Sequence, residues 1–269
     1  MPTVKLKDVE INYELEGDGA ETIVLVNGLA DDLTTWFGQM EDFLGAGYRV
    51  LRFDNRGIGK SSRPKGPYTT AMMAADAKAL VDRLALRDFH LVGVSMGGMI
   101  SQEYALAYQG DLRSLTLACT YAAPGPFCAR MFKLWQDMAP AMGVPAVMRD
   151  VTLWAFTQEF FLTQEATLKE FEAAMAALDL PVETYLSQLN SIQTHDTRSR
   201  LKSIEVPTMV LAGAEDILIP MDLSRELHGL IPGAAFATVK GGHAFMWEHP
   251  KPFNEAILGF IGEHRKTGK

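Results

Sequence analysis

Short apolar runs recur along the chain, and most of them are separated by segments whose apolar residues repeat at helical spacing. The runs contain few polar residues, which is typical of strands that are buried on both faces of a sheet. They occupy residues 22–26, 48–53, 89–94, 112–119, 208–213 and 234–239, and the clearest helical segments occupy 69–86 and 96–110. Strands that alternate with helices predict a mostly parallel central sheet flanked by helices, so the fold class is α/β.

The start of the chain follows a different pattern. In residues 4–15, "VKLKDVEINYEL", polar residues stand between the apolar ones. This alternation is typical of an antiparallel hairpin with one face toward solvent. We therefore predict a hairpin at one edge of the sheet, which makes residues 112–119 the sixth strand.

Residues 122–202, here called the inserted block, interrupt the alternation of strands and helices. They contain helix-like segments rich in Met and aromatic residues, and prolines at 124, 126, 140, 145 and 181 separate the pieces. We predict a core domain formed by residues 1–121 and 203–269, with the inserted block as a helical lid after the sixth strand. The simpler alternative, that apolar residues of the block only pack on one another, must hold for at least half of them.

Charge and composition restrict the partners and the compartment. The formal net charge is −8 and Lys and Arg form no long run, so nucleic acid and anionic membranes, which require clustered positive charge, are not expected as partners. No apolar segment resembles a signal-peptide core or reaches the length of a membrane span. Cys119 and Cys128 are too few for a disulfide framework. We expect a cytoplasmic protein whose partner is a small molecule.

The stretch "HLVGVSMGGM" contains the motif G-x-S-x-G, formed by Gly93, Ser95 and Gly97. A strand followed by an ordinary Gly-rich turn would also give this motif. Here, however, the motif ends an apolar strand and begins a helix, as a nucleophile elbow does. Small residues flank the serine because the turn forces a strained backbone and leaves no room for larger side chains. We predict that Ser95 is a nucleophile, with a helix N-terminus beneath any developing negative charge.

A serine hydroxyl becomes a good nucleophile only when a base takes its proton. Of the six histidines, His243 follows a strand and two glycines in "VKGGHAFMWEHP", and His195 near the end of the inserted block is a weaker competitor. A third group should orient the imidazole and stabilise its positive charge. Asp216 follows a strand in "VLAGAEDILIP" and is our candidate, with Glu215 as the alternative. Two acids at this position are also typical of a turn or a helix cap.

The order Ser95, Asp216, His243 along the chain is that of α/β-hydrolases, and not that of chymotrypsin or subtilisin. The sequence resembles the α/β-hydrolase superfamily along nearly its whole length. The resemblance is carried by "VNGLADD", "RFDNRGIGKSS", the elbow, "GAEDILIP" and "GGHAFMWEHP". It implies the α/β-hydrolase fold and a catalytic triad made of these three residues.

The resemblance also implies an oxyanion hole formed by the backbone N–H groups of Leu29 and Met96. The first loop of the family usually reads His-Gly, whereas Asn27 precedes the glycine here. Because the donor belongs to the main chain, we expect the hole to survive this departure, with altered hydrogen bonding inside the loop. Four further residues are expected to brace this loop region without taking part in chemistry: Asp54, Arg56, Gly57 and Gly59.

Within the superfamily, "VNGLADDLTTW", "YRVLRFDNRGIG" and "LVGVSMGGMI" are most similar to 3-oxoadipate enol-lactonases and neighbouring carboxylesterases. A lactone that carries a free carboxylate needs a nearby cation, but the basic residues of the inserted block show no pocket-facing pattern. The block instead offers apolar side chains, which favour an uncharged substrate: Phe127, Met131, Phe132, Trp135, Trp154, Phe160 and Phe161. The predicted substrate pocket consists of Trp36, Phe127, Met131, Trp135, Trp154 and Phe245.

The predicted function is that of a serine carboxylesterase, which cleaves an ester through an acyl-enzyme. A 3-oxoadipate enol-lactonase or another lactonase is the first alternative. A perhydrolase, thioesterase, acyltransferase or C–C hydrolase would use the same triad. A receptor that binds a small ligand without turnover could share the fold. The chain contains no H-E-x-x-H motif, Cys/His cluster or P-loop, so we expect no metal and no organic cofactor.

Overall fold

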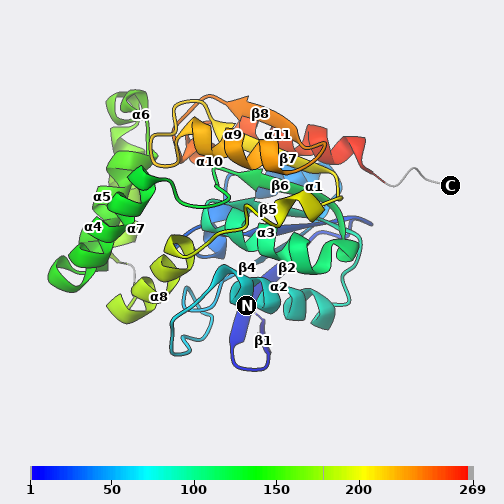
Figure 1. Cartoon of the computed structure of the whole chain (residues 1–269), viewed down its shortest axis with the longest axis horizontal. Helices are drawn as coiled ribbons and strands as arrows, with labels where there is room; N and C mark the ends of the chain where they lie inside the picture. The colour runs from blue at the N-terminus through cyan, green and yellow to red at the C-terminus, as the bar shows by residue number, and fades with distance from the viewer. Residues whose placement is uncertain (1, 178, 266–269) are drawn as a thin grey trace.

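The computed structural model describes residues 2–177 and 179–265, so residues 1, 178 and 266–269 of the predicted domains lie outside it (Figure 1). The described residues form an eight-stranded sheet in the order β1-β2-β4-β3-β5-β6-β7-β8. The strands are β1 (Thr3–Lys5), β2 (Glu10–Glu16), β3 (Thr22–Val26), β4 (Arg49–Phe53), β5 (Phe89–Val94), β6 (Leu112–Ala118), β7 (Thr208–Gly213) and β8 (Ala235–Val239). β2 pairs antiparallel with β1 and β4, and the other neighbouring strands are parallel. The predicted α/β class is confirmed.

Helices cover both faces of this sheet, which explains why its central strands are continuously apolar. All residues of β3, β5 and β7 are buried. The helices outside the inserted block are α1 (Met40–Gly45), α2 (Thr70–Arg83), α3 (Met96–Tyr108), α9 (Met221–Leu230), α10 (Phe245–Glu248) and α11 (Pro250–Glu263). Short 3₁₀ helices form η1 (Leu33–Trp36), η2 (Gln109–Asp111) and η3 (Leu201–Ser203).

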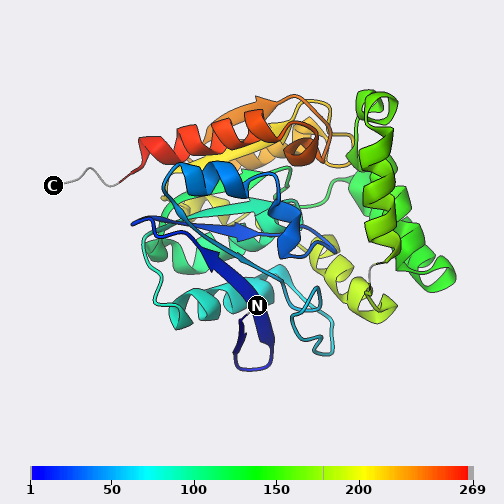
Figure 2. The ribbon, with the colours of Figure 1, turned by 180° about the vertical axis from the view of Figure 1, so that it is seen from behind.

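The two faces of the sheet carry separate apolar cores. On one face, α2, α3 and α9 contribute Leu80, Ile100 and Leu227, among others. On the other face, α1 and α11 contribute Phe43 and Ile257, and Figure 2 shows these two helices side by side in front of the sheet. The sheet is therefore held rigidly from both sides, and only the loops at the ends of its strands are free to form a site.

The inserted block runs between β6 and β7 and folds into helices. They are α4 (Pro126–Met142), α5 (Val144–Ala155), α6 (Gln158–Thr163), α7 (Glu165–Ala176) and α8 (Val182–Gln193). Helices α4 to α7 stand beside the sheet domain, and α8 returns toward it (Figure 1). Pro126 and Pro145 occupy the first turns of α4 and α5, and Pro181 caps α8. Pro140 does not separate two pieces as we predicted, because it lies in the last turn of α4.

The parallel strands direct their carboxyl ends to one edge of the sheet. The loops that follow β3, β5, β7 and β8 therefore meet there, as in other open α/β sheets. These loops contain the residues predicted for the triad and Leu29 of the predicted oxyanion hole, and Met96 is the first residue of α3, directly after the loop that follows β5. Among the described residues, no helix is both long enough and apolar enough to span a membrane.

Candidate active site

Ser95 occupies a strained turn between β5 and α3. Its backbone has φ 52° and ψ −118°, a conformation that a residue with a side chain rarely adopts. The Ser95 N–H donates to the Ala118 carbonyl at 2.9 Å, which ties the turn to the end of β6. Helix α3 begins at the next residue, Met96. The hydroxyl is therefore presented at the carboxyl edge of the sheet by a backbone fixed on both sides.

The glycines of the motif are required by close backbone approach. A Cβ at Gly93 would lie 2.3 Å from the carbonyl oxygen of Gly97, and a Cβ at Gly97 would lie 2.0 Å from that of Val26. A Cβ at Gly98 would lie 2.6 Å from a methyl carbon of Thr120. Real Cβ atoms do not approach other atoms so closely, so any side chain at these positions would displace the turn.

His243 and Asp216 meet Ser95 from the loops after β8 and β7. Nε2 of His243 is 3.0 Å from the Ser95 hydroxyl, and Nδ1 is 2.8 Å from Oδ2 of Asp216. A carboxylate can only accept, so Nδ1 donates and Nε2 is left to accept from the serine hydroxyl. The other Asp216 oxygen accepts from the N–H groups of Leu218 and Ile219 at 2.9 and 2.8 Å. The three side chains thus form a continuous path for removing a proton from Ser95.

The alternative candidates from the sequence lie elsewhere. Glu215 is exposed, whereas Asp216 is buried. His195 is buried, and its ring nitrogens face Thr70 and the side-chain oxygen of Gln102, at 3.0 and 3.3 Å. Burial lowers the pKa of His195 to about 4, so its imidazole is neutral at physiological pH. His195 therefore belongs to a buried structural network.

The N–H groups of Leu29 and Met96 are available to a ligand. In the part of the chain that the structure describes, neither amide donates to another protein group. Leu29 follows β3 and Met96 follows Ser95, so the two amides flank the serine from neighbouring strands. Two free main-chain donors beside a hydroxyl are the arrangement required to hold a developing oxyanion.

Asn27, the departure from the usual His-Gly loop, has a clear structural role. Its amide nitrogen donates to the carbonyl of Phe53 at 2.8 Å, and its side-chain oxygen accepts from the indole N–H of Trp36 at 2.7 Å. Both side chains are fully buried. Asn27 therefore connects the first loop to β4 and η1, and its side chain takes no part in the oxyanion hole.

The buried side chain of Asp54 also holds the first loop in place. Asp54 accepts from the N–H groups of Leu33 and Lys60, at 2.7 and 2.8 Å. Gly59 leaves room for this carboxylate, because a Cβ at its position would lie 2.3 Å from Asp54 Oδ2. Arg56 makes two hydrogen bonds with Asp76 of α2, at 2.6 and 2.7 Å. Asp54 and Gly59 thus have the bracing positions that we expected for them, whereas the Arg56 side chain is bound to α2.

The inserted block also reaches the first loop. Gln188 of α8 accepts from the Ala30 N–H at 3.1 Å and donates to the Arg56 carbonyl at 3.0 Å. Ala30 itself has a positive φ of 61°. The conformation of the residue next to Leu29 is therefore fixed by a side chain from the inserted block.

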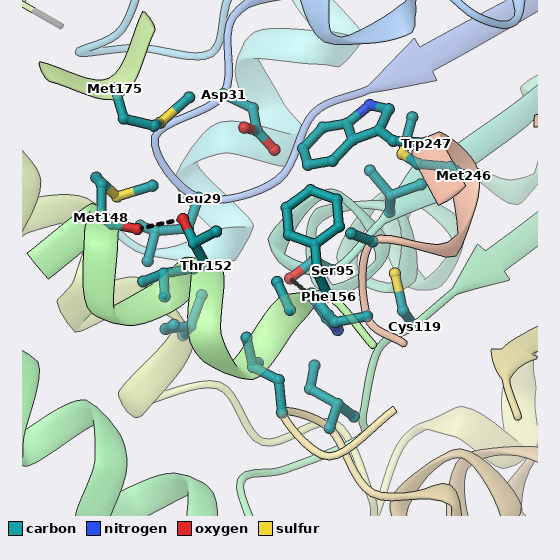
Figure 3. A pocket seen from close by; sticks show the side chains of 18 of the residues that line it. Leu29, Asp31, Ser95, Cys119, Met148, Thr152, Phe156, Met175, Met246 and Trp247 are labelled. Atoms are coloured by element: carbon teal, nitrogen blue, oxygen red, sulfur yellow. Dashed lines mark hydrogen bonds between the residues drawn. The ribbon is translucent and has the colours of Figure 1, made fainter. Parts of the chain in front are cut away.

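An apolar cavity opens directly onto Ser95 and His243 (Figure 3). The volume of this cavity is about 100 Å³. Its polar or ionisable side chains are those of Asp31, Ser95, Cys119, Thr152 and His243, and no Lys or Arg is among the described residues that line it. The apolar wall consists of Leu29, Val94, Met99, Phe132, Trp135, Met148, Val151, Ala155, Phe156, Phe171, Met175, Ile192, Leu218, Ile219, Ala244, Met246 and Trp247. This chemistry favours a small substrate without negative charge.

Comparison with known proteins agrees with this geometry. A family model described as the alpha/beta hydrolase fold matches residues 21–250. The chain belongs to the α/β-hydrolase family. It is 35% identical over 264 residues to a protein of Azorhizobium caulinodans named "Putative carbamate hydrolase RutD", covering 98% of this chain and 99% of that protein. A protein of the same name from Caulobacter vibrioides is 31% identical over 256 residues, covering 93% and 95% of the two chains.

The solved structures show the same relationship. The enol-lactonase from Burkholderia xenovorans LB400 superimposes with a TM-score of 0.90 at 28% sequence identity. The match covers 97% of this α/β-hydrolase and 100% of the enol-lactonase. The resemblance that we inferred from the motifs is thus confirmed at the level of the family and its fold.

The predicted pocket residues of this hydrolase are distributed over several environments. Trp135 lines the cavity. Trp36 is buried against Asn27, and Phe245 packs against Phe253 beneath the sheet. Like Trp36 and Phe245, the remaining three lie outside the cavity wall, so the prediction was wrong for five of the six residues. Met131 is buried in the core, Phe127 is exposed on α4, and Trp154 packs on Phe127 and donates to Asp150.

The cavity wall instead contains residues that sequence reasoning did not single out. The inserted block contributes Met148 and Phe156, and helix α10, just after His243, contributes Met246 and Trp247. The apolar spacing in the inserted block predicted a helix at α4 but not which face of that helix points toward the cavity. The sequence therefore did not show that Phe132 and not Phe127 lines the cavity. Asp31 was also missed as a pocket residue, although its place beside Leu29 in the first loop was a usable signal.

Proposed function

We propose that this chain is a serine hydrolase that cleaves small, uncharged carboxylic esters through an acyl-enzyme on Ser95. The observation that carries the proposal is the contact of the Ser95 hydroxyl with His243, at the mouth of an apolar cavity and beside two free backbone amides. A nucleophile, its base and an oxyanion site within reach of one another are the parts that acyl transfer requires.

The reaction follows from the geometry. His243 Nε2 takes the Ser95 proton while the serine oxygen attacks the carbonyl carbon, and Asp216 stabilises the imidazolium that forms. The amides of Leu29 and Met96 hold the oxyanion, each contributing roughly 3 kcal/mol to transition-state stabilisation. The imidazolium then protonates the departing alcohol. Water, deprotonated by the same histidine, releases the acid and restores the serine.

The inserted block would act as a lid in this reaction. Phe132 of α4, Met148 of α5 and Phe156, which directly follows α5, belong to its part of the cavity wall. An apolar cover excludes bulk water, which strengthens the hydrogen bonds to the oxyanion. The absence of Lys and Arg from the described lining argues against a lactone that carries a free carboxylate.

The proposal is tested with p-nitrophenyl esters from acetate to octanoate, comparing the wild type with Ser95→Ala. We expect repeated turnover by the wild type, background rates for the variant and an optimum at short acyl chains. A single event per molecule would instead indicate a receptor that keeps a slow triad. Equal rates for both proteins would mean that Ser95 is not the nucleophile.

Carbamate hydrolysis is a second candidate, and two observations favour it. The relatives named above carry that activity in their names. The carboxyl group of Asp31 faces the cavity and can accept a hydrogen bond from a carbamate nitrogen. Phenyl acetate and phenyl carbamate differ only in a methyl or an amino group on the carbonyl carbon, so the ratio of their kcat/KM values distinguishes the two functions. A ratio in favour of the carbamate would replace the ester proposal.

A further inference from the structure

Asp31 places a carboxyl group inside the apolar cavity. Figure 3 shows its side chain pointing into the cavity near Trp247 and Phe156. A Cβ built on Gly28 would lie 2.6 Å from Asp31 Oδ2 and 3.6 Å from the Cβ of Ser95. Asp31 and Ser95 thus approach the same point beside Gly28, so we expect an acyl group bound to Ser95 to lie within reach of this carboxyl group.

The Asp31 carboxyl group has no hydrogen-bond partner among the described residues, unlike the other acids of this region. Asp32 accepts from Thr34, Asp54 from Leu33, and Asp216 from three donors. Asp31 is half-buried, and carboxyl groups withdrawn from bulk water to this degree or more are normally satisfied by protein donors. An unsatisfied carboxyl group that faces a cavity is therefore available to the molecule that fills it.

The electrostatic surroundings of Asp31 are poor in positive charge. The pKa of Asp31 is raised to about 7: burial against the apolar wall is the largest cause, Asp32 on the same loop adds to it, and His243 on the loop after β8 opposes both. Cys119, which follows β6 and also faces the cavity, is kept neutral because burial raises the pKa of its thiol. Near neutral pH, a substrate therefore meets Asp31 in both its neutral and its anionic form.

We propose that Asp31 is a specificity-determining residue, which admits uncharged and amine-bearing acyl groups and rejects acyl groups that carry a carboxylate. A carboxylate brought into this cavity would find no cation in the described lining and one like charge at close range. An amino group would instead donate to the unpartnered Asp31 oxygens. The proposal rests on acylation at Ser95, but it concerns which acyl group reaches the serine.

The test compares three p-nitrophenyl esters whose acyl chains all have six carbons. The hexanoate ester is uncharged, the ε-aminocaproate ester carries a positive charge, and the adipate monoester carries a negative charge. Asp31→Asn keeps the shape of the side chain and removes the charge, and Asp31→Thr is a second neutral variant in case the first fails to fold. Asp32→Asn is the matched control, because it removes the same charge from the neighbouring residue outside the cavity and keeps a good helix cap.

At about pH 8 we expect Asp31→Asn to raise the ratio of kcat/KM for the adipate ester to that for the hexanoate ester by at least about tenfold. The ratio of kcat/KM for the aminocaproate ester to that for the hexanoate ester should fall. The wild-type preference should weaken as the pH falls below about 7, because Asp31 becomes protonated. Asp32→Asn should keep the wild-type ranking. Unchanged ratios in both Asp31 variants would overturn the proposal, because a merely structural Asp31 would alter all three esters alike.

A binding experiment separates this proposal from the proposed reaction. Calorimetry with Ser95→Ala and the three corresponding anilides measures the charge preference without turnover. If wild type hydrolyses none of the esters while adding Asp31→Asn to Ser95→Ala abolishes a charge preference in binding, the ester proposal fails and the role of Asp31 stands. If binding shows no charge preference, the role of Asp31 is refuted whatever the turnover.

Discussion

Replacing Gly97 by alanine tests whether the elbow and the first loop share one rigid backbone contact. A Cβ at this position would lie 2.0 Å from the Val26 carbonyl oxygen, 2.6 Å from its carbon and 2.7 Å from the Asn27 carbonyl oxygen. All three are backbone atoms at the end of β3, so no side chain can move aside. We expect a loss of about 1–3 kcal/mol in the free energy of unfolding, as for other overpacked sites.

The same substitution should reduce activity beyond its effect on stability. The contact would be between the start of α3 and the end of β3. Relieving it must move Ser95, which precedes α3, away from Leu29, which follows β3. A displacement of the order of 1 Å at a reacting centre costs about 10²-fold in rate. Gly110→Ala is the control, since no atom lies within 4 Å of a Cβ built there. Both variants are compared by urea unfolding and by kcat/KM on p-nitrophenyl butyrate. A Gly97→Ala protein with wild-type kcat/KM would refute the shared contact.

Three further predictions concern the hydrogen-bond networks. Asp216→Asn should lower kcat by about 10⁴-fold with little change in the free energy of unfolding. The backbone N–H groups of Leu218 and Ile219 should bind the amide oxygen, which turns the NH₂ group toward His243 and selects the wrong tautomer of its imidazole. A near-normal kcat would contradict this. Asn27→Ala should lower the free energy of unfolding, measured with urea, by about 2–5 kcal/mol. The indole N–H of buried Trp36 loses its acceptor and the backbone carbonyl of Phe53 loses its donor. A change below about 1 kcal/mol would argue against this. The pKa of His195 is near 6.5 in the unfolded chain and near 4 in the folded protein. The free energy of unfolding should therefore fall by up to about 3 kcal/mol as the pH drops through this window, because the unfolded chain binds the proton more tightly. His195→Gln should make the free energy of unfolding depend less on pH in this window.

The sequence predicted the strands and the inserted block because these depend on local patterns. Residues 22–26, 89–94 and 208–213 coincide with fully buried strands, since strands covered on both faces are apolar at every position. The loops after such strands meet at one edge, so Ser95, Asp216 and His243 could be assembled from chain order alone.

The cavity wall could not be derived in this way. Whether Phe127 or Phe132 faces the cavity depends on the rotation of α4, which is set by packing against α5 and α8 and not by the period of its own sequence. The contacts of Asn27 with Phe53 and of Gln188 with Ala30 join residues distant in sequence, and no local pattern encodes them. Only the folded loop shows that Asp32 caps η1 and that Asp31 faces the cavity.

The central claim is that Ser95 is the nucleophile and that His243 activates it. The most direct measurement is intact-protein and peptide mass spectrometry after incubation with a fluorophosphonate, which forms a stable adduct only with an activated serine. We predict one phosphonyl group per chain, located on Ser95, in the wild type, and labelling slowed by orders of magnitude in His243→Gln. No adduct on the wild type, or an adduct on another residue, would contradict the account.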